Sequence, residues 1–336
     1  MTGRVKRGLL VIVKQQSEPM DPTRRHLVTA AAVGVGMMPP RFAVAGPSPS
    51  TGAGASTASA DASETFSARS SDGTVLAGEA KGDHGAPEIL FIHGLRQSRL
   101  SWDKQFDDPA LSGLRLVRFD LRGHGDSDKP TALEAYSDAD RWADDVATVI
   151  DAAKLRRPVL VGWSLGGYVA GAYLRKYGGS HIAGVNLVDA VTKLAPDLLT
   201  PLAGDFTGSA TSHDLPTRVA ATADFLAACF YRPPTGIELQ RMLVVNGMTA
   251  RAANEGFVRT STTDLGPAFA AYGGPILLTH GAHDRLVRQA MAEHVRSLKP
   301  QSRLSVYAES GHSPFHEEPV RFSRELAAFV AEVNRS

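Results

Sequence analysis

A short turn motif constrains this chain more than any other stretch of its sequence. The apolar run Val159–Val161 leads into Gly-Trp-Ser-Leu-Gly at residues 162–166, and a helical pattern follows from Gly167 to Tyr177. A strand that feeds a helix through so tight a turn holds its apex residue in a strained backbone conformation, with the side chain clear of the sheet. A Cβ on either flanking glycine would collide with the turn or with the neighbouring strand. Ser164 is therefore the candidate nucleophile.

Strand and helix patterns alternate along the rest of the chain from residue 66 onward. Continuous apolar runs are typical of strands that are buried on both faces of a parallel sheet, and Arg141–Leu155 has the spacing of an amphipathic helix. This alternation predicts an α/β fold with a mostly parallel, doubly wound sheet. The predicted strands are Glu88–His93, Leu114–Asp120, Ile182–Val188, Pro275–Thr279 and Arg303–Tyr307, preceded by a hairpin of Phe66–Arg69 and Val75–Glu79, and Val320–Val333 is the predicted last helix.

The pattern changes between about residues 190 and 273. Apolar residues there follow helical spacing, and prolines separate the helical stretches. We expect a helical cap, inserted after the strand that ends near Val188. Its predicted helices are Val219–Tyr231, Ile237–Val245 and Ala250–Val258, broken by Pro201, Pro216, Pro233 and Pro234.

The first 45 residues resemble a twin-arginine export signal. Arg24-Arg25 precede the uncharged, small-residue run Thr29–Met38, and Ala43-Val44-Ala45 has the small-x-small pattern of a cleavage site. We expect cleavage near Ala45 and export to the periplasm or the medium; a disordered basic tail is the alternative. Met20 directly precedes the motif and is an alternative translation start to Met1.

Two further segments follow the expected signal. Residues 46–65 are rich in Ser, Gly, Ala, Thr and Pro, so they bury too little apolar surface to offset their ordering entropy and are predicted to be a flexible linker. Residues 66–336 form the predicted catalytic domain. The uncharged run in the signal is too short for a membrane span, which needs about 20 strongly apolar residues.

Composition excludes several classes of protein. The chain has 336 residues, 43% of them hydrophobic, which is enough to bury a sizeable core. Without residues 1–45 the net charge is near −4, so neither nucleic acid nor an anionic membrane is an expected partner. The single Cys229 excludes a disulfide framework and is expected to be buried, and no Cys/His cluster has zinc-ligand spacing.

Several ordered motifs together resemble the α/β-hydrolase superfamily, specifically its esterase and cofactor-free haloperoxidase-like members. The resemblance covers about Phe66–Ser336 and implies the α/β-hydrolase fold, with nucleophile, acid and histidine in that chain order. The motifs are His93-Gly94, Asp120-x-Arg122-Gly123-His124-Gly125-x-Ser127, Gly162-Trp163-Ser164-Leu165-Gly166-Gly167, Gly281-x-x-Asp284, and Gly311-His312 followed by Glu317, Pro319 and Phe322.

A serine hydroxyl is a poor nucleophile near neutral pH, so it needs a base to take its proton and an anion to orient that base. His312 is the expected base, because it follows a predicted strand on a loop that resembles the family's catalytic loop; His316 is the weaker alternative. Asp284 follows the strand at 275–279 and is the expected acid. Asp189 is its rival, because some family members take the acid from that position.

The tetrahedral intermediate of acyl transfer needs N–H donors for its oxyanion. Leu165, at the N-terminus of the elbow helix, is expected to supply one through its backbone, and Leu95 is expected to supply the other. His93 is expected to brace this loop by hydrogen bonding. Trp163, beside the nucleophile, is expected to shape the acyl pocket.

Other polar residues near these motifs are expected to be structural. We expect an ion pair and a turn from Asp120, Arg122 and Asp126, and loop packing from His280 and His283. Without a nearby third ligand, the two histidines predict no metal site. No cofactor is expected.

The resemblance implies a serine hydrolase that acts on small-molecule carboxylic esters, lactones or acyl substrates through an acyl-enzyme. Perhydrolysis by the same triad, with hydrogen peroxide as the acceptor, is the alternative, and a non-catalytic binding protein that keeps the fold is a third possibility. Ser164 argues against a haloalkane dehalogenase or an epoxide hydrolase, which need Asp at the elbow. Nothing in the sequence indicates an oligomeric state.

Overall fold

A computed structural model describes residues 63–260 and 264–335. The predicted export signal, both candidate starts and residues 46–62 of the predicted linker lie outside the described residues. No described helix is long and apolar enough to cross a membrane.

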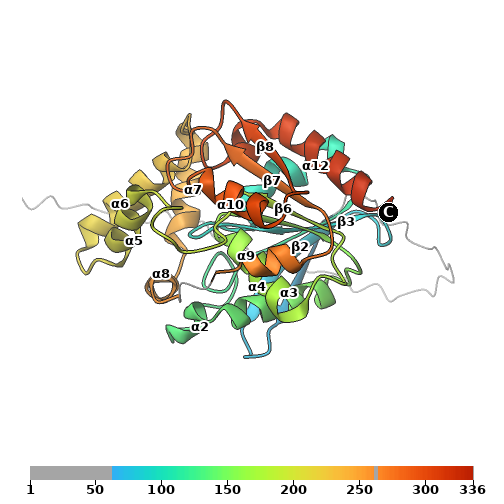
Figure 1. Cartoon of the computed structure of the whole chain (residues 1–336). Coiled ribbons are helices and arrows are strands. Elements are labelled where there is room, and N and C mark those ends of the chain that lie inside the picture. The colour runs from blue at the N-terminus through green and yellow to red at the C-terminus, as the bar shows by residue number, and fades with distance from the viewer. Residues whose placement is uncertain (1–62, 261–263, 336) are drawn as a thin grey trace, which may run out of the picture. The chain divides into compact units, whose positions relative to one another are not determined.

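An eight-stranded sheet with the order β1-β2-β4-β3-β5-β6-β7-β8 forms the centre of the fold (Figure 1). β2 pairs antiparallel with β1 and β4, and every other pairing is parallel, which confirms the predicted mostly parallel sheet. The strands are β1 Glu64–Arg69, β2 Val75–Lys81, β3 Glu88–Ile92, β4 Arg115–Phe119, β5 Val159–Trp163, β6 Gly184–Val188, β7 Ile276–Gly281 and β8 Arg303–Tyr307.

Strand ends differ from the predicted ones by at most two residues. The first strand begins at Glu64, inside the segment that was expected to be linker. Glu64 pairs with Ala80 of β2, and its carboxylate accepts a hydrogen bond of 2.5 Å from the Arg115 guanidinium. These contacts extend the strand beyond what local composition predicts.

Helices cover both faces of the sheet. One face carries α3 (Ala139–Ala152), α4 (Leu165–Tyr177), α9 (Gly266–Ala271) and α10 (Ala290–Leu298), and the other carries α12 (Pro319–Val333). Short helices complete the connections: η1 Arg99–Trp102, α1 Asp103–Phe106, η2 Pro109–Leu111, α2 Glu134–Ser137 and α11 Pro314–Glu317.

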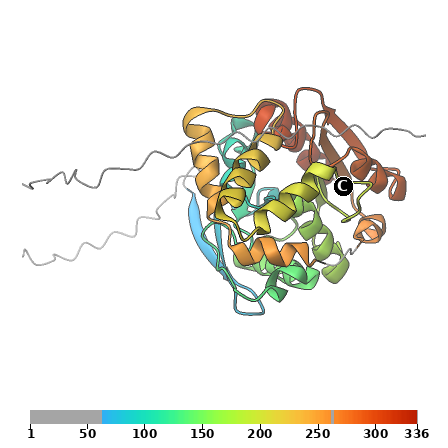
Figure 2. The ribbon, with the colours of Figure 1, turned by 90° about the vertical axis from the view of Figure 1, so that its left-hand side faces the viewer.

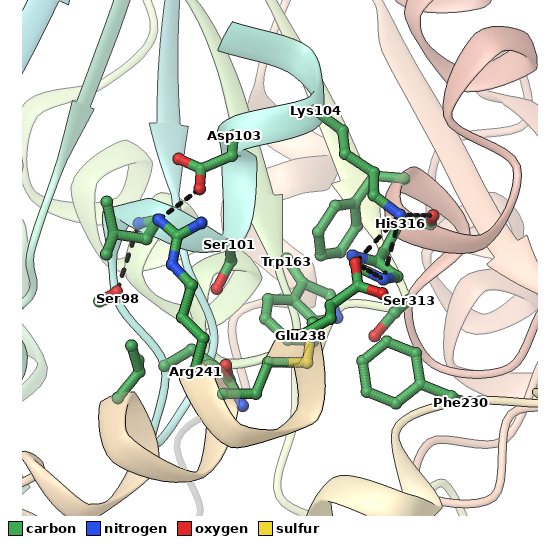
Figure 3. Close-up of a pocket in the computed structure, with 15 residues that line it drawn as sticks. Ser98, Ser101, Asp103, Lys104, Trp163, Phe230, Glu238, Arg241, Ser313 and His316 are labelled. Carbon is green, nitrogen blue, oxygen red and sulfur yellow. Dashed lines mark hydrogen bonds and ion pairs between the residues drawn. The ribbon is translucent and has the colours of Figure 1, made fainter. Parts of the chain in front are cut away.

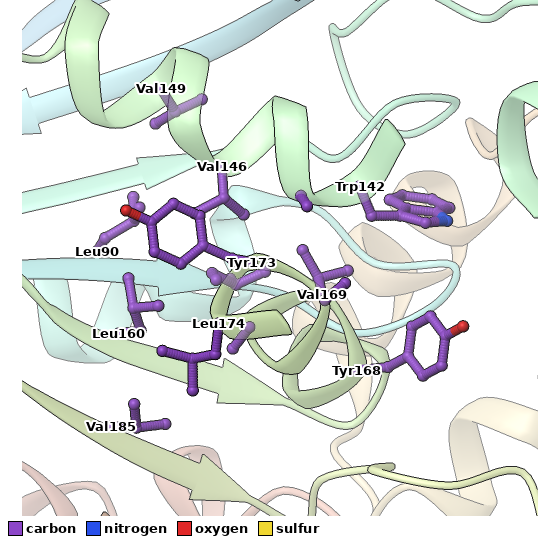
Figure 4. Packing of buried hydrophobic residues seen from close by; sticks show 14 of the residues in the cluster. Leu90, Trp142, Val146, Val149, Leu160, Tyr168, Val169, Tyr173, Leu174 and Val185 are labelled. Carbon is purple, nitrogen blue, oxygen red and sulfur yellow. The ribbon is translucent and has the colours of Figure 1, made fainter. Parts of the chain in front are cut away.

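Side chains alternate between the two faces of each strand, so the sheet has a separate hydrophobic core on each face. Leu90, Leu160 and Val185 are register neighbours on β3, β5 and β6, and they pack in one core with Val146 of α3 and Val169 of α4 (Figure 4). On β3 and β5 the residues next to them, Ile89, Phe91, Val159 and Val161, belong to the second core under α12. Burial on both faces explains why these strands are continuously apolar.

Between β6 and α9 the chain forms four helices: α5 (Pro201–Thr211), α6 (Leu215–Ala228), α7 (Gly236–Gly247) and α8 (Arg251–Val258). Figure 2 views them from their own side, in yellow and orange. We call them the cap helices.

Prolines begin two of these helices, and Pro233 and Pro234 lie between α6 and α7. Pro201 and Pro216 lie in the first turns of α5 and α6, where a missing N–H leaves no hydrogen bond unmade. Thr200 and Asp214 precede them as N-caps, and their side chains accept hydrogen bonds from backbone N–H groups in those turns. Helix α5, which the sequence pattern did not predict, is explained by this capping.

Candidate active site

Ser164 occupies the apex of the turn between β5 and α4. Its backbone angles are φ 54° and ψ −116°, a conformation that residues with a side chain rarely adopt. A Cβ on Gly162 would lie 2.5 Å from the Gly166 carbonyl oxygen, and one on Gly166 would lie 2.2 Å from the Ile92 oxygen. The turn therefore tolerates only glycine at both flanks, and it holds Ser164 in a strained, outward position.

His312 lies in the loop after β8 and contacts Asp284 in the loop after β7. The two side chains are buried, and His312 Nδ1 donates a hydrogen bond of 2.7 Å to Asp284 Oδ2. Asp284 Oδ1 accepts from the backbone N–H groups of Leu286 and Val287, at 2.7 and 3.0 Å. Burial favours the neutral acid, but His312 and these hydrogen bonds hold the pKa of Asp284 below its ordinary value. Asp284 is thus an anion that orients His312.

Asp189, the rival acid, is buried but makes different contacts. Its Oδ1 accepts the Gly281 N–H at 2.9 Å and lies 3.3 Å from His280 Nδ1. Burial and the negative charge of Asp284 raise the pKa of Asp189 well above its ordinary value. The structure therefore distinguishes the two carboxyls: Asp284 touches His312 and has a lowered pKa, whereas the pKa of Asp189 is raised.

The carboxyls and a histidine form a compact cluster here. Ligand atoms of Asp189, His280 and Asp284 lie within 4.8 Å of one another, a spacing that could hold a metal ion. Oxygens of both carboxyls already accept backbone hydrogen bonds, and Asp284 also accepts from His312. A metal at this position would compete with the Asp284–His312 contact.

A cavity of about 460 Å³ contains both Ser164 and His312. Leu95 and Leu165, the two expected oxyanion donors, line the same cavity. Its remaining lining is mostly apolar and comes from the cap helices and the loops at the ends of β6 and β7. Lining residues from these elements include Val191, Leu194, Leu199, Phe206, Phe225, Phe257, Leu286 and Val287.

Two buried histidines hold the loop that follows β3. His93 Nε2 accepts the Leu121 N–H at 2.9 Å, and its Nδ1 lies 2.7 Å from the Gly94 carbonyl oxygen, as the bracing role predicts. His124 Nε2 accepts the Arg96 N–H at 3.1 Å, a contact that sequence reasoning missed. Burial lowers the pKa of His93 to about 4 and that of His124 to about 3, so both are neutral.

Trp163 does not line the cavity around Ser164, contrary to expectation. Its side chain lines a second cavity of about 230 Å³, shown in Figure 3 with Glu238 and Arg241 of α7. Its indole Nε1 donates a hydrogen bond of 2.6 Å to the His312 carbonyl oxygen. Neighbouring residues of an extended chain point to opposite sides, so Trp163 is turned away from the pocket and fixes the His312 backbone instead.

His316, the weaker candidate base, also lines the second cavity (Figure 3). Its Nε2 lies 3.1 Å from Glu238 Oε1, and Lys104 contacts the same ring. Burial and the Lys104 charge lower its pKa to about 4. It is thus engaged away from Ser164.

Glu317 holds the His312 loop against the segment between α6 and α7. Its Oε2 accepts the Gly311 N–H at 2.7 Å, and its Oε1 accepts the N–H groups of Tyr231 and Arg232, at 2.8 and 2.9 Å. The sequence motif included Glu317 without revealing this function. An acidic residue five positions after His312 was the available signal.

Several residues that were expected to have no catalytic role form ion pairs or packing contacts. Arg99 forms ion pairs with Asp120 and Asp126, and Arg122 pairs with Asp145 at 2.6 Å, both side chains being fully buried. Cys229 is buried, as predicted. His283 stacks on the Tyr231 ring at 3.8 Å, which is a packing contact in a loop.

The family model described as the alpha/beta hydrolase fold matches residues 87–319. The chain belongs to this family. It is 30% identical over 265 residues to a bifunctional esterase/perhydrolase from Acinetobacter calcoaceticus, covering 74% of this chain and 93% of that protein.

Two further relatives fit the same family. A non-heme haloperoxidase from Rhodococcus erythropolis is 30% identical over 276 residues, covering 77% of this chain and 97% of the relative. A solved structure from Burkholderia cenocepacia, described as that of a candidate aryl esterase, superposes with a TM-score of 0.78 and 38% identity, covering 81% of this chain and all of that one.

Proposed function

We propose that this protein is a serine hydrolase that cleaves carboxylic esters or lactones through an acyl-enzyme intermediate. The observation that carries the proposal is the strained Ser164 in one cavity with His312, whose Nδ1 is held 2.7 Å from Asp284. Relatives named as an esterase/perhydrolase and as a candidate aryl esterase support it.

The proposed reaction has two halves, formation of the acyl-enzyme and its hydrolysis, and the same catalytic groups act in both. His312 takes the proton of Ser164 as the hydroxyl oxygen attacks the ester carbonyl, and Asp284 stabilises the imidazolium that forms. The N–H groups of Leu95 and Leu165 bind the oxyanion. His312 then returns its proton to the leaving alcohol, which departs as the acyl-enzyme forms. Water, activated by the same histidine, releases the acid and restores Ser164.

Perhydrolysis is a second candidate, favoured by the haloperoxidase and perhydrolase relatives. Hydrogen peroxide would replace water as the nucleophile that attacks the acyl-enzyme. The product would then be a peracid, and the residues and their roles would be unchanged.

The purified protein should hydrolyse short p-nitrophenyl esters without added metal or cofactor, because every group that acyl transfer needs is present in the chain. Release of p-nitrophenol, measured with and without a chelator, tests this expectation. Adding acetate esters, peroxide and halide to the same enzyme measures perhydrolysis by halogenation of a dye. Activity that appears only after a metal is supplied would contradict the mechanism.

We also propose export by the twin-arginine route, with a mature N-terminus near Gly46. The support is the Arg24-Arg25 pair and the Ala43-Val44-Ala45 site, together with a domain whose parallel sheet requires long-range pairing and whose only cysteine needs no oxidising compartment. Folding before export suits such a chain.

Changing Arg24 and Arg25 to Lys should leave uncut precursor in the cytoplasm, because it removes the paired arginines of the expected signal. Immunoblotting of cell fractions and N-terminal sequencing of the exported protein provide the readout. Unaltered secretion of the double variant, or an exported chain that begins at Met1 or Met20, would disprove the route.

A further inference from the structure

Arg96 stands out among the residues that line the catalytic cavity. It follows Leu95 in the loop after β3 and lines the cavity that contains Ser164 and His312. Only 3% of its surface is exposed, and its φ is +61°. Outside glycine this left-handed conformation is unfavourable, because Cβ approaches the following carbonyl oxygen. The chain therefore holds a cationic residue, under backbone strain, next to its expected oxyanion donor.

The guanidinium of Arg96 contacts the cap helices but meets no carboxylate. Its Nε donates to Asn254 Oδ1 of α8 at 3.0 Å, and its Nη2 donates to the Phe206 carbonyl of α5 at 3.1 Å. Its central carbon lies 4.9 Å from the centre of the Phe225 ring of α6. Nη1 is buried and has no hydrogen-bond partner in the described part of the chain.

Other buried arginines of this protein are neutralised by carboxylates. Arg115 pairs with Glu64, Arg118 with Glu79 and Arg122 with Asp145, at 2.5 to 2.8 Å. No ion pair to Arg96 occurs among residues 63–260 and 264–335. Arg96 is thus the exception among these buried cations.

An uncompensated buried cation costs several kcal/mol. Burial lowers the pKa of Arg96 to about 10, which still leaves it charged at neutral pH. The Cys229 thiol lies nearby, but burial raises its pKa, so it supplies no negative charge. Arg96 thus places a positive charge at the wall of a mostly apolar cavity, and Nη1 of the same guanidinium is a buried donor without a partner among the described residues.

We infer that Arg96 binds a carboxylate on the substrate, so that the preferred substrates are esters whose acyl chain ends in a second, ionised carboxyl group. The inference rests on the proposed function. Nη1 would donate a charge-assisted hydrogen bond to that carboxylate, and the apolar lining from Phe206, Phe225 and their neighbours would contact the chain between the two carboxyl groups. The class is that of half-esters of dicarboxylic acids.

The competing interpretation is that Arg96 only ties α5 and α8 to the loop after β3. Such a clamp would affect every substrate alike, because it acts on the shape of the cavity. Recognition of a carboxylate affects only substrates that carry one. The ratio of the kcat/KM values for two esters, one with and one without a carboxylate, therefore separates the two interpretations.

Monoethyl adipate and ethyl hexanoate provide that ratio, since they share acyl length and leaving group and differ in a terminal carboxylate. The full chain should show the higher kcat/KM for monoethyl adipate, and adipate should inhibit more strongly than hexanoate. Arg96→Met should lower the ratio of the two kcat/KM values by about 10- to 100-fold, the range expected for a hydrogen bond to a charged group. Arg96→Lys, which keeps the charge, should retain part of the preference.

Arg251→Met is the matched control, because it removes a cap cation that is paired with Glu255 and does not line the catalytic cavity. It should leave the ratio unchanged. Hydrolysis of ethyl hexanoate with no preference for the half-ester, and no selective inhibition by adipate, would overturn the inference while leaving the proposed function intact. This comparison in the unaltered protein holds even if the Arg96 variants fail to fold.

If neither ester is cleaved, the carboxylate site is judged by binding alone, and the p-nitrophenyl ester assay decides the proposed function separately. Adipate should then raise the thermal unfolding midpoint of the unaltered protein more than hexanoate does, and Arg96→Met should abolish the difference. Equal shifts for the two acids would overturn the inference in that case.

Discussion

Ser164→Ala should lower kcat/KM for a p-nitrophenyl ester by about 10⁴-fold or more while the protein stays folded. The reason is that the variant removes the Ser164 hydroxyl, which is the proposed nucleophile, so no acyl-enzyme can form there. Alanine also has less bulk in the strained position at φ 54°, so folding should not suffer. Steady-state kinetics with purified protein measures the loss, and the thermal unfolding midpoint controls for folding.

His312→Ala should cause a comparable loss, and the Ser164→Ala/His312→Ala double variant should be little worse than either alone. Nucleophile and base act as a unit, so removing one leaves nothing for the other to do. Losses that multiply in the double variant would mean that the two residues act independently, which contradicts the proposed mechanism.

Asp284→Asn should cost about 10⁴-fold in kcat, because an amide in this position cannot stabilise the imidazolium and favours the wrong histidine tautomer. The 2.7 Å contact with His312 Nδ1 is what the substitution alters. Asp189→Asn should cost less than about 10-fold, since the raised pKa of Asp189 favours the protonated carboxyl, which an amide matches in shape and charge.

These two isosteric variants control for each other, because both replace a buried carboxyl in the same cluster. The kcat of each, measured beside its thermal unfolding midpoint, separates catalysis from folding. A severe loss in Asp189→Asn together with an active Asp284→Asn would transfer the acid role to the rival position.

Much of the fold was predictable, because local patterns determine it. Strands buried on both faces read as continuous apolar runs, and the two glycines around Ser164 have no steric alternative. The candidate site was predictable for a similar reason. Ser164, Asp284 and His312 each follow a strand, and parallel strands bring such ends together at one edge of the sheet.

The rest depends on contacts between distant segments. The hydrogen bond from Trp163 to the His312 carbonyl oxygen joins residues 149 positions apart, and no local pattern encodes that contact. The same holds for His124, which supports the Arg96 backbone, and for Glu317, which joins two loops. The isolation of the Arg96 charge is visible only once the carboxylates between residues 63 and 335 that the structure describes have been placed.

Mass spectrometry after treatment with a fluorophosphonate tests the central claim most directly, because this reagent forms a stable adduct with an activated serine. The claim predicts a single adduct on the peptide that contains Ser164, together with complete loss of esterase activity. It also predicts no adduct in Ser164→Ala, and only slow labelling in His312→Ala. An adduct on another residue, or full esterase activity with Ser164 unmodified, would contradict the claim that Ser164 is the nucleophile.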